Sequence, residues 1–240
     1  MNAKLARRIA AGLFLCLSPA ASRNAAAGPA QAPPSVKSLT RLLEEHYRRP
    51  RTLRAVFLER YGEGQKDARI ESGTVYFRRP GQMRWEYESP EKKLFLVDGR
   101  TTWFYVPYDH TVTKAPVKES SDWRTPLALL TGKADLARLC ERIDLVDEEG
   151  IPSGHAVLRC VPKQPQSQPD EKDYSEVRLE VNTFSGELAR IQIRQPGGIE
   201  LEYRFGDWQT DIPLDSSLFR FEVPQGVAIV DGLATPDSLK

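Results

Sequence analysis

The histidines, carboxylates and cysteines are the residues that could carry out chemistry in this chain. Three histidines occur among 240 residues, His46, His110 and His155, and their wide separation does not suit a shared metal ion. The sequence has no Gly-x-Ser-x-Gly elbow, His-Glu-x-x-His pair or phosphate-binding loop. Glu86 and Glu88 lie two residues apart, but on the solvent face of a predicted strand. The sequence therefore predicts a protein that is not an enzyme and needs no cofactor or metal ion.

Two cysteines outside the N-terminal segment suggest a disulfide, since the export signal described below would place them in an oxidising compartment. They flank a predicted hairpin. If its turn is centred on Gly150, Cys140 faces Cys160 and Ile143 faces Val157 across the strands. This register predicts a cross-strand disulfide that contributes about 3 kcal/mol by restricting the unfolded chain. Two buried free thiols are the alternative.

Residues 1–27 have the anatomy of a secretory signal peptide. Basic residues within 4–8 precede an apolar run at 9–17, which is too short to cross a bilayer. Small residues follow this run, so cleavage is expected after Ala20 or near Ala27. The sequence therefore predicts an exported protein.

A lipoprotein signal acylated at Cys16 is the weaker reading of this segment, because the bulky Leu15 precedes the cysteine. Removing the signal peptide takes away four basic residues and no acidic ones, which changes the formal net charge from +1 to −3. The basic cluster at 48–54 is short and is interrupted by Pro50. A mildly acidic chain without a polybasic tract is not expected to bind nucleic acid or anionic lipid headgroups.

The rest of the chain predicts a single domain that begins with one helix. Residues 28–35 form a linker rich in proline and alanine, and the segment 35–50 has apolar residues at helical spacing, with Ser35 as the N-cap and Pro50 as the stop. The domain is expected to span 36–231. Residues 232–240 form a tail.

Strand-like segments dominate the domain. Residues 115–139 interrupt them and predict two short helices, one of them within 125–139. The inventory is mainly β, of the α+β class, with about ten or eleven antiparallel strands, one N-terminal helix and one short helical insertion, and it leaves open whether the strands form a closed barrel or an open one with the helices as its lid. The expected strands are 52–61, 69–80, 83–89, 93–99, 100–107, 140–147, 155–162, 174–182, 187–195, 198–206 and 219–227.

A sheet this large has more apolar surface on its concave face than two short helical segments readily cover. We therefore expect an apolar cavity of ligand size, with a fully packed core as the alternative. Strand alternation, the first helix and the lid together predict its lining: Leu39, Leu43, Phe57, Val75, Phe77, Met83, Trp85, Tyr87, Phe95, Val97, Leu127 and Leu130. Trp103 and Tyr105 are assigned to no site, because they could equally be structural.

Two motifs follow one another in residues 73–107. The first consists of Gly73, Val75, Phe77, Arg79, Pro80, Gly81, Met83, Arg84, Trp85, Glu86, Tyr87 and Pro90, and the second of Asp98, Gly99, Thr101, Trp103, Tyr105 and Pro107. The specific combination within them is Arg79-Pro80, Arg84-Trp85, Tyr87, Pro90, Asp98-Gly99, Trp103 and Tyr105. With the segments 125–136 and 214–230, these motifs resemble the periplasmic outer-membrane lipoprotein carrier family, LolA, across roughly 36–231. The resemblance implies an incomplete antiparallel β-barrel closed by a short helical lid.

The resemblance implies a monomeric periplasmic chaperone whose cavity holds the acyl chains of lipoproteins. It would receive them from an inner-membrane lipoprotein-releasing transporter and deliver them to an outer-membrane acceptor. The family's latch arginine corresponds to Arg79, which would bond across the cavity mouth to the lid in the empty form. Arg78 would face the other way, toward solvent.

This sequence departs from the family pattern in its cysteine pair, its polar loop at 162–173 and its leucine-rich lid. A half-barrel binder of another lipid or an envelope-stress sensor domain is the alternative function.

Overall fold

The computed structural model describes residues 34–63, 68–117, 130, 135–163 and 176–232. The predicted signal peptide, most of the linker, most of the tail and most of the predicted lid, including Leu127, lie outside these residues. Within the described part of the chain, no helix has the length and apolar character needed to cross a membrane.

The described residues are mostly strand. The helices are α1 (Val36–Arg48) and α2 (Leu136–Leu139), with short 3-10 helices η2 (Pro196–Gly198) and η3 (Ser216–Phe219). The strands are β1 (Thr52–Glu63), β2 (Arg69–Arg78), β3 (Gln82–Ser89), β4 (Lys93–Val97), β5 (Thr101–Val106), β6 (Thr111–Pro116), β7 (Cys140–Val146), β8 (His155–Pro162), β9 (Glu176–Asn182), β10 (Leu188–Arg194), β11 (Ile199–Thr210) and β12 (Ala228–Asp231).

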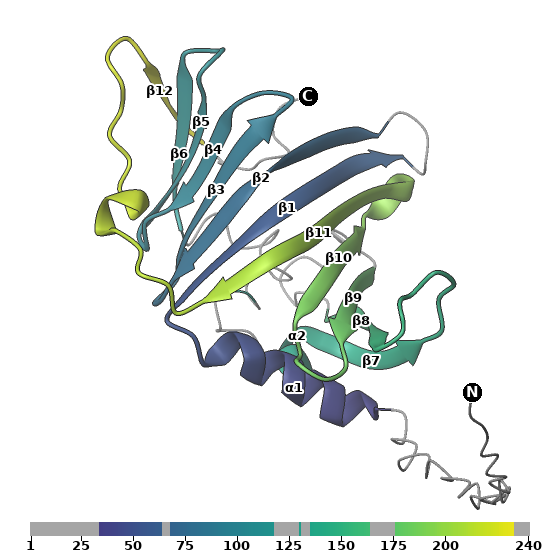
Figure 1. Cartoon of the computed structure of the whole chain (residues 1–240). Coiled ribbons are helices and arrows are strands. Elements are labelled where there is room, and N and C mark those ends of the chain that lie inside the picture. The colour runs from purple at the N-terminus through teal and green to yellow at the C-terminus, as the bar shows by residue number, and fades with distance from the viewer. Residues whose placement is uncertain (1–33, 64–67, 118–129, 131–134, 164–175, 233–240) are drawn as a thin grey trace, which may run out of the picture. The chain divides into compact units, whose positions relative to one another are not determined.

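All of these strands belong to one open, curved sheet (Figure 1). Its order is β12-β6-β5-β4-β3-β2-β1-β11-β10-β9-β8-β7, and every neighbouring pair is antiparallel except β12 and β6, which are parallel. The predicted fold class, an incomplete antiparallel barrel with few helices, is confirmed. Two details of the prediction are wrong. Residues 111–116 form a strand, and the last strand is 228–231 rather than 219–227.

Helix α1 forms as the sequence predicts. Ser35 caps it by accepting a hydrogen bond from the Ser38 backbone N–H, and its buried residues Leu39, Leu43 and Tyr47 recur at helical spacing. The Tyr47 hydroxyl accepts a hydrogen bond from the Leu188 N–H at 2.9 Å. This bond ties α1 to the start of β10. The helix therefore covers strand ends on one face of the sheet, called here the inner face.

The C-terminal segment packs against the opposite, outer face. After β11 the chain forms η3 and runs on to β12 at the sheet edge, in yellow in Figure 1. Phe219 of η3 is buried, and the Arg84 Nη1 group of β3 donates to the Leu218 carbonyl at 3.0 Å. Arg84 shares the face of Glu86 and Glu88 by strand alternation, and the sequence predicts that this face is exposed to solvent. The outer face is thus partly covered by the segment around Phe219, which the sequence predicts to be part of a strand at 219–227.

The structure contains a disulfide between Cys140 and Cys160, with Cα atoms 5.5 Å apart. The register from which the sequence predicts it is wrong. Ile143 rather than Cys140 lies opposite Cys160, and the pairing shifts beside Cys140. The connecting loop is longer than a turn centred on Gly150 would be. The bridge therefore joins residues that are diagonal, not directly opposite, across β7 and β8.

Candidate functional site

The inner face brings the predicted lining residues together. Every one that lies in the described part of the chain is buried and belongs to a single apolar cluster. Pairing across β1 to β4 places Phe57 opposite Gly73, Val75 opposite Trp85, and Trp85 opposite Phe95. The members described are Leu39, Leu43, Phe57, Val75, Phe77, Met83, Trp85, Tyr87, Phe95, Val97 and Leu130.

Aromatic rings occupy the centre of this cluster. The Phe57 ring lies 4.8 Å from Trp85 and 5.1 Å from Tyr87, centroid to centroid, in edge-to-face geometry. Gly73 lies between these rings in the sheet, and a Cβ there would come within 1.8 Å of the Glu86 carbonyl oxygen. Only glycine therefore permits this close approach of β2 and β3.

Sequence reasoning missed the contribution of β11 to the lining. Tyr203 is buried with its ring 5.3 Å from that of Trp85, and Phe205 lies 6.2 Å from Trp85. Both residues point to the inner face, because they lie two positions apart on β11. Their place beside β1 depends on a long-range pairing of two strands that are far apart in sequence. No local signal in the sequence identifies that neighbour.

Beyond the aromatic rings, the inner face carries buried polar groups that the sequence analysis did not single out. The Tyr87 hydroxyl donates to the Glu59 carboxylate at 2.8 Å, and Lys93 forms an ion pair with Glu71. Burial, reinforced by the negative charge of Glu59, raises the pKa of Tyr87 well above its ordinary value. The phenol therefore keeps its proton and acts as a donor. The Lys93 and Glu71 side chains are only 5% and 4% exposed.

Arg79 lies at the other end of the apolar lining, directly after β2. Its Nη1 group donates a hydrogen bond to the carbonyl oxygen of Arg48, the last residue of α1, and its backbone N–H donates to Arg51 at 3.0 Å. Burial first, and the charge of Arg48 second, lower the pKa of this guanidinium, while Asp211 opposes the shift. The partner in the described structure is thus the N-terminal helix rather than the lid that the sequence prediction named. A helix C-terminus leaves carbonyl groups free to accept such a bond.

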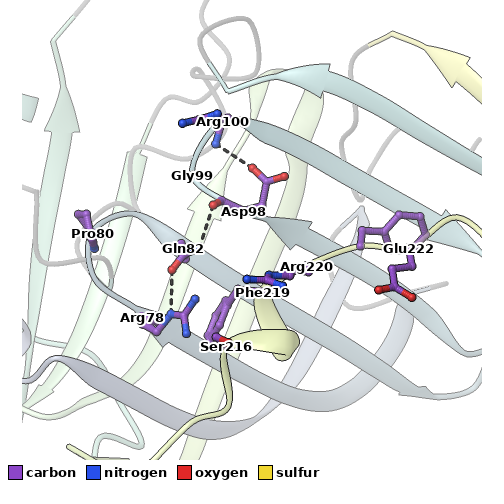
Figure 2. Close-up of a pocket in the computed structure, with 11 residues that line it drawn as sticks. Arg78, Pro80, Gln82, Asp98, Gly99, Arg100, Ser216, Phe219, Arg220 and Glu222 are labelled. Atoms are coloured by element: carbon purple, nitrogen blue, oxygen red, sulfur yellow. Dashed lines mark hydrogen bonds between the residues drawn. The ribbon is translucent and has the colours of Figure 1, made fainter.

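Arg78 lies on the outer face, as predicted, but is not an ordinary solvated residue. Its Nε donates to Gln82 at 2.8 Å, and its guanidinium lies 4.5 Å from the centre of the Phe219 ring. Figure 2 shows Arg78 at the edge of an outer-face pocket of about 740 Å³. Arg100, Arg220, Asp98 and Glu222 are among its other lining residues. Its charged lining suits a polar group and is separate from the apolar inner face.

The Asp98-Gly99-x-Thr101-x-Trp103 motif has a structural explanation. The Asp98 carboxylate accepts hydrogen bonds from the backbone N–H groups of Arg100 and Thr101, both at 2.8 Å. It also accepts one from Trp103 Nε1 at 3.1 Å. Gly99 has a φ of +105°, which favours glycine. The motif therefore fixes the turn between β4 and β5, and Trp103 faces outward, 5.3 Å from the Phe221 ring.

Known proteins resemble this chain in sequence and in fold. The sequence model of the family described as "Outer membrane lipoprotein carrier protein LolA" matches residues 50–222. A Neisseria meningitidis serogroup C protein named outer-membrane lipoprotein carrier protein is 28% identical over 168 residues, which are 70% of this chain and 75% of the relative. An Azotobacter vinelandii protein of the same name is 28% identical over 207 residues, which are 85% and 92% of the two chains.

Among solved structures, an uncharacterized conserved protein from Thermus thermophilus matches with a TM-score of 0.51 at 12% sequence identity. The match covers 82% of this chain and 98% of that one. At this identity the likeness shows a shared fold.

Proposed function

Because this chain belongs to the LolA family of outer membrane lipoprotein carrier proteins, we propose that it is a periplasmic chaperone for lipoproteins. It binds their acyl chains against the inner face of its sheet and carries them from the inner to the outer membrane. The observation that carries the proposal is the buried aromatic and aliphatic cluster of the inner face, which includes Phe57, Val75 and Trp85. Acyl chains are recognised by apolar area rather than by directed polar contacts, and such a face offers that area.

The proposed route has two partners besides the cargo. An inner-membrane lipoprotein-releasing transporter supplies the lipoprotein, and an outer-membrane acceptor removes it. The carrier itself acts as a monomer that has been exported through its signal peptide. The names of the curated relatives, outer-membrane lipoprotein carrier protein, support a carrier rather than an enzyme.

Arg79 is proposed to act as the latch of the empty carrier. Its hydrogen bond to the Arg48 carbonyl joins the turn after β2 to the end of α1. Acyl chains that enter between α1 and the sheet displace Leu39 and Leu43 from the inner face, so α1 must move and the bond must break. The carrier then has a closed empty state and an open loaded state, and the latch bond contributes to the free energy that separates them.

A reconstituted release assay tests this function. Membrane vesicles that contain a triacylated lipoprotein and its releasing transporter are incubated with ATP and the purified protein, and the soluble fraction is then analysed. We expect the wild-type protein to bring the lipoprotein into the soluble fraction as a complex. Absence of any soluble lipoprotein, while a characterised carrier releases it in parallel, would overturn the proposal.

In the same assay, Arg79→Leu is expected to change the amount of lipoprotein released or retained, whereas Arg78→Leu is not. Arg78→Leu is the matched control because it removes the same side chain from the neighbouring position on the outer face. Equal release and retention by the wild type and both variants would remove the latch from the mechanism.

A further inference from the structure

A row of polar side chains crosses the inner face on the far side of the predicted lining from Arg79, and beyond it Tyr61 and Leu201 continue the apolar cluster on β1 and β11. We call Tyr203, Glu59, Glu71, Tyr87 and Lys93 the polar row. Strand register brings its members side by side. Glu59 of β1 lies opposite Tyr203 of β11 and opposite Glu71 of β2, and Tyr87 of β3 lies opposite Lys93 of β4. The row therefore runs across five adjacent strands, roughly perpendicular to them.

The polar row is buried and internally paired. The relative exposures of its residues do not exceed 7%. Lys93 pairs with Glu71 while its ammonium lies 5.1 Å from the Tyr87 ring centre, and Tyr87 donates to Glu59. Arg69 lies 3.5 Å from Glu71, Nε to Oε1. Because the row is already buried and paired, a methylene group could pass it only by separating these pairs, and it would give no hydrogen bond in return.

Buried ion pairs add little to stability compared with apolar side chains of the same size. The energetics of folding therefore do not explain why Lys93 and Glu71 interrupt a face that is otherwise apolar. Lys93 and Tyr87 also line a surface pocket of about 320 Å³ with Arg84, Glu86 and Glu88, which belong to the outer face.

The apolar stretch between Arg79 and the polar row is somewhat longer than the acyl layer of one membrane leaflet. Along β1, Leu53, Ala55 and Phe57 face inward before Glu59, and at about 3.3 Å per residue the six steps from Leu53 to Glu59 span about 20 Å. The acyl layer of one leaflet is about 15 Å thick, half of a bilayer's hydrocarbon core, but its chains are not fully extended there. The same chain is longer when extended, so one that entered at the α1 end would come close to the polar row with its last carbons.

We propose that the polar row limits how deeply acyl chains enter. It thereby sets the chain length beyond which further methylene groups no longer raise the affinity. This inference rests on the proposed function, because it concerns the same inner face. Chains up to the limit gain affinity with each added methylene, whereas carbons beyond it meet the Glu71–Lys93 pair and gain none. The preferred cargo is therefore a lipid whose acyl chains are no longer than those of ordinary membranes.

The test measures affinity against chain length. Lysophosphatidylcholines whose acyl chains lengthen two carbons at a time compete with a fluorescent acyl probe for the purified protein; their bulky head group disfavours entry head first. The wild-type protein is expected to gain about fourfold in affinity per added methylene and then to level off. A wild-type protein that binds no acyl probe overturns the proposed function itself. Binding that rises without levelling off over the whole series overturns the depth limit alone.

Two double variants and a control complete the test. Glu71→Leu with Lys93→Met replaces the ion pair by apolar side chains of similar size, so the fold should persist. The levelling-off point is expected to move to longer chains. The control, Glu176→Leu with Arg178→Met, makes the same replacement in a pair 2.6 Å apart on the outer face of β9 and should leave it unchanged.

If the first variant does not fold, as judged by its thermal unfolding, Glu59→Leu with Tyr87→Phe removes the other bond of the row and should shift the levelling-off point likewise. A folded variant of either kind with the wild-type dependence on chain length would overturn the inference.

Discussion

Replacing Arg79 with leucine is expected to raise the affinity for acyl ligands about fivefold. A hydrogen bond from a charged group contributes about 1.5–3 kcal/mol to stability. We take about 1 kcal/mol here, because Arg79 is only partly buried and solvent weakens such interactions. Its Nη2 group is also buried without a hydrogen-bond partner among the described residues. This unfavourable burial reduces the net stabilisation that Arg79 gives the closed state. If binding requires the latch to break, lowering the free energy of opening by about 1 kcal/mol multiplies the apparent affinity by about five.

Titration of a fluorescent acyl probe into the wild-type protein, Arg79→Leu and Arg78→Leu measures this effect directly. Urea unfolding of the same three proteins separates it from stability. Arg78→Leu loses a hydrogen bond to Gln82 and the contact with Phe219, so its unfolding free energy should fall by about 1–2 kcal/mol without a change in probe affinity. The reasoning is refuted if Arg79→Leu binds the probe as the wild type does, or if Arg78→Leu shows the same increase.

Three further predictions concern stability, each measured by urea unfolding. Replacing Cys140 and Cys160 together by serine should cost about 3 kcal/mol, since the bridge spans 20 residues; a midpoint unaffected by the replacement would count against the disulfide. Asp98→Ala should cost about 2 kcal/mol, because two backbone N–H groups lose their acceptor, and Asp98→Asn should recover part of it. Burial, together with the charge of Glu59, raises the pKa of Tyr87 in the folded protein above 10.0. The unfolded chain therefore loses this proton at a lower pH than the folded protein does. Stability should fall above pH 10 by about 1.4 kcal/mol per pH unit for this group, and equally steep curves for the wild type and Tyr87→Phe would contradict that.

Strand alternation was enough to predict the inner face. Val75, Phe77, Trp85 and Phe95 occupy alternate positions in short segments bounded by turns, and the structure buries all of them together. Helix α1 could be predicted equally well, because its cap and its apolar spacing are local features. These parts of the fold depend on interactions within a few residues, which a sequence displays directly.

Features that depend on the pairing of strands far apart in the sequence could not be predicted in this way. Segment 219–227 alternates as a strand does, but Phe219 and Phe221 pack on the outer face, and the paired strand comes later, at Ala228–Asp231. The β7–β8 register shifts beside Cys140, so a symmetric turn gave the wrong opposing residues for a bridge that exists.

The polar row shows the same limitation for the candidate site. Glu59 does stand out in the sequence, as a charge on the same face as Phe57. Its significance depends on Tyr87, Glu71 and Lys93, which come together only through the register of four strands. Local pattern reasoning treats each of these charges as solvent-exposed, whereas the structure buries them.

The most direct test of the central claim is mass spectrometry of what co-purifies with the protein from the periplasm, under conditions that preserve non-covalent complexes. The account predicts a triacylated lipoprotein bound to a single copy of the chain, displaced when the acyl probe is added in excess. Free phospholipid alone, or no bound lipid in a periplasm that contains lipoproteins in transit, would contradict it.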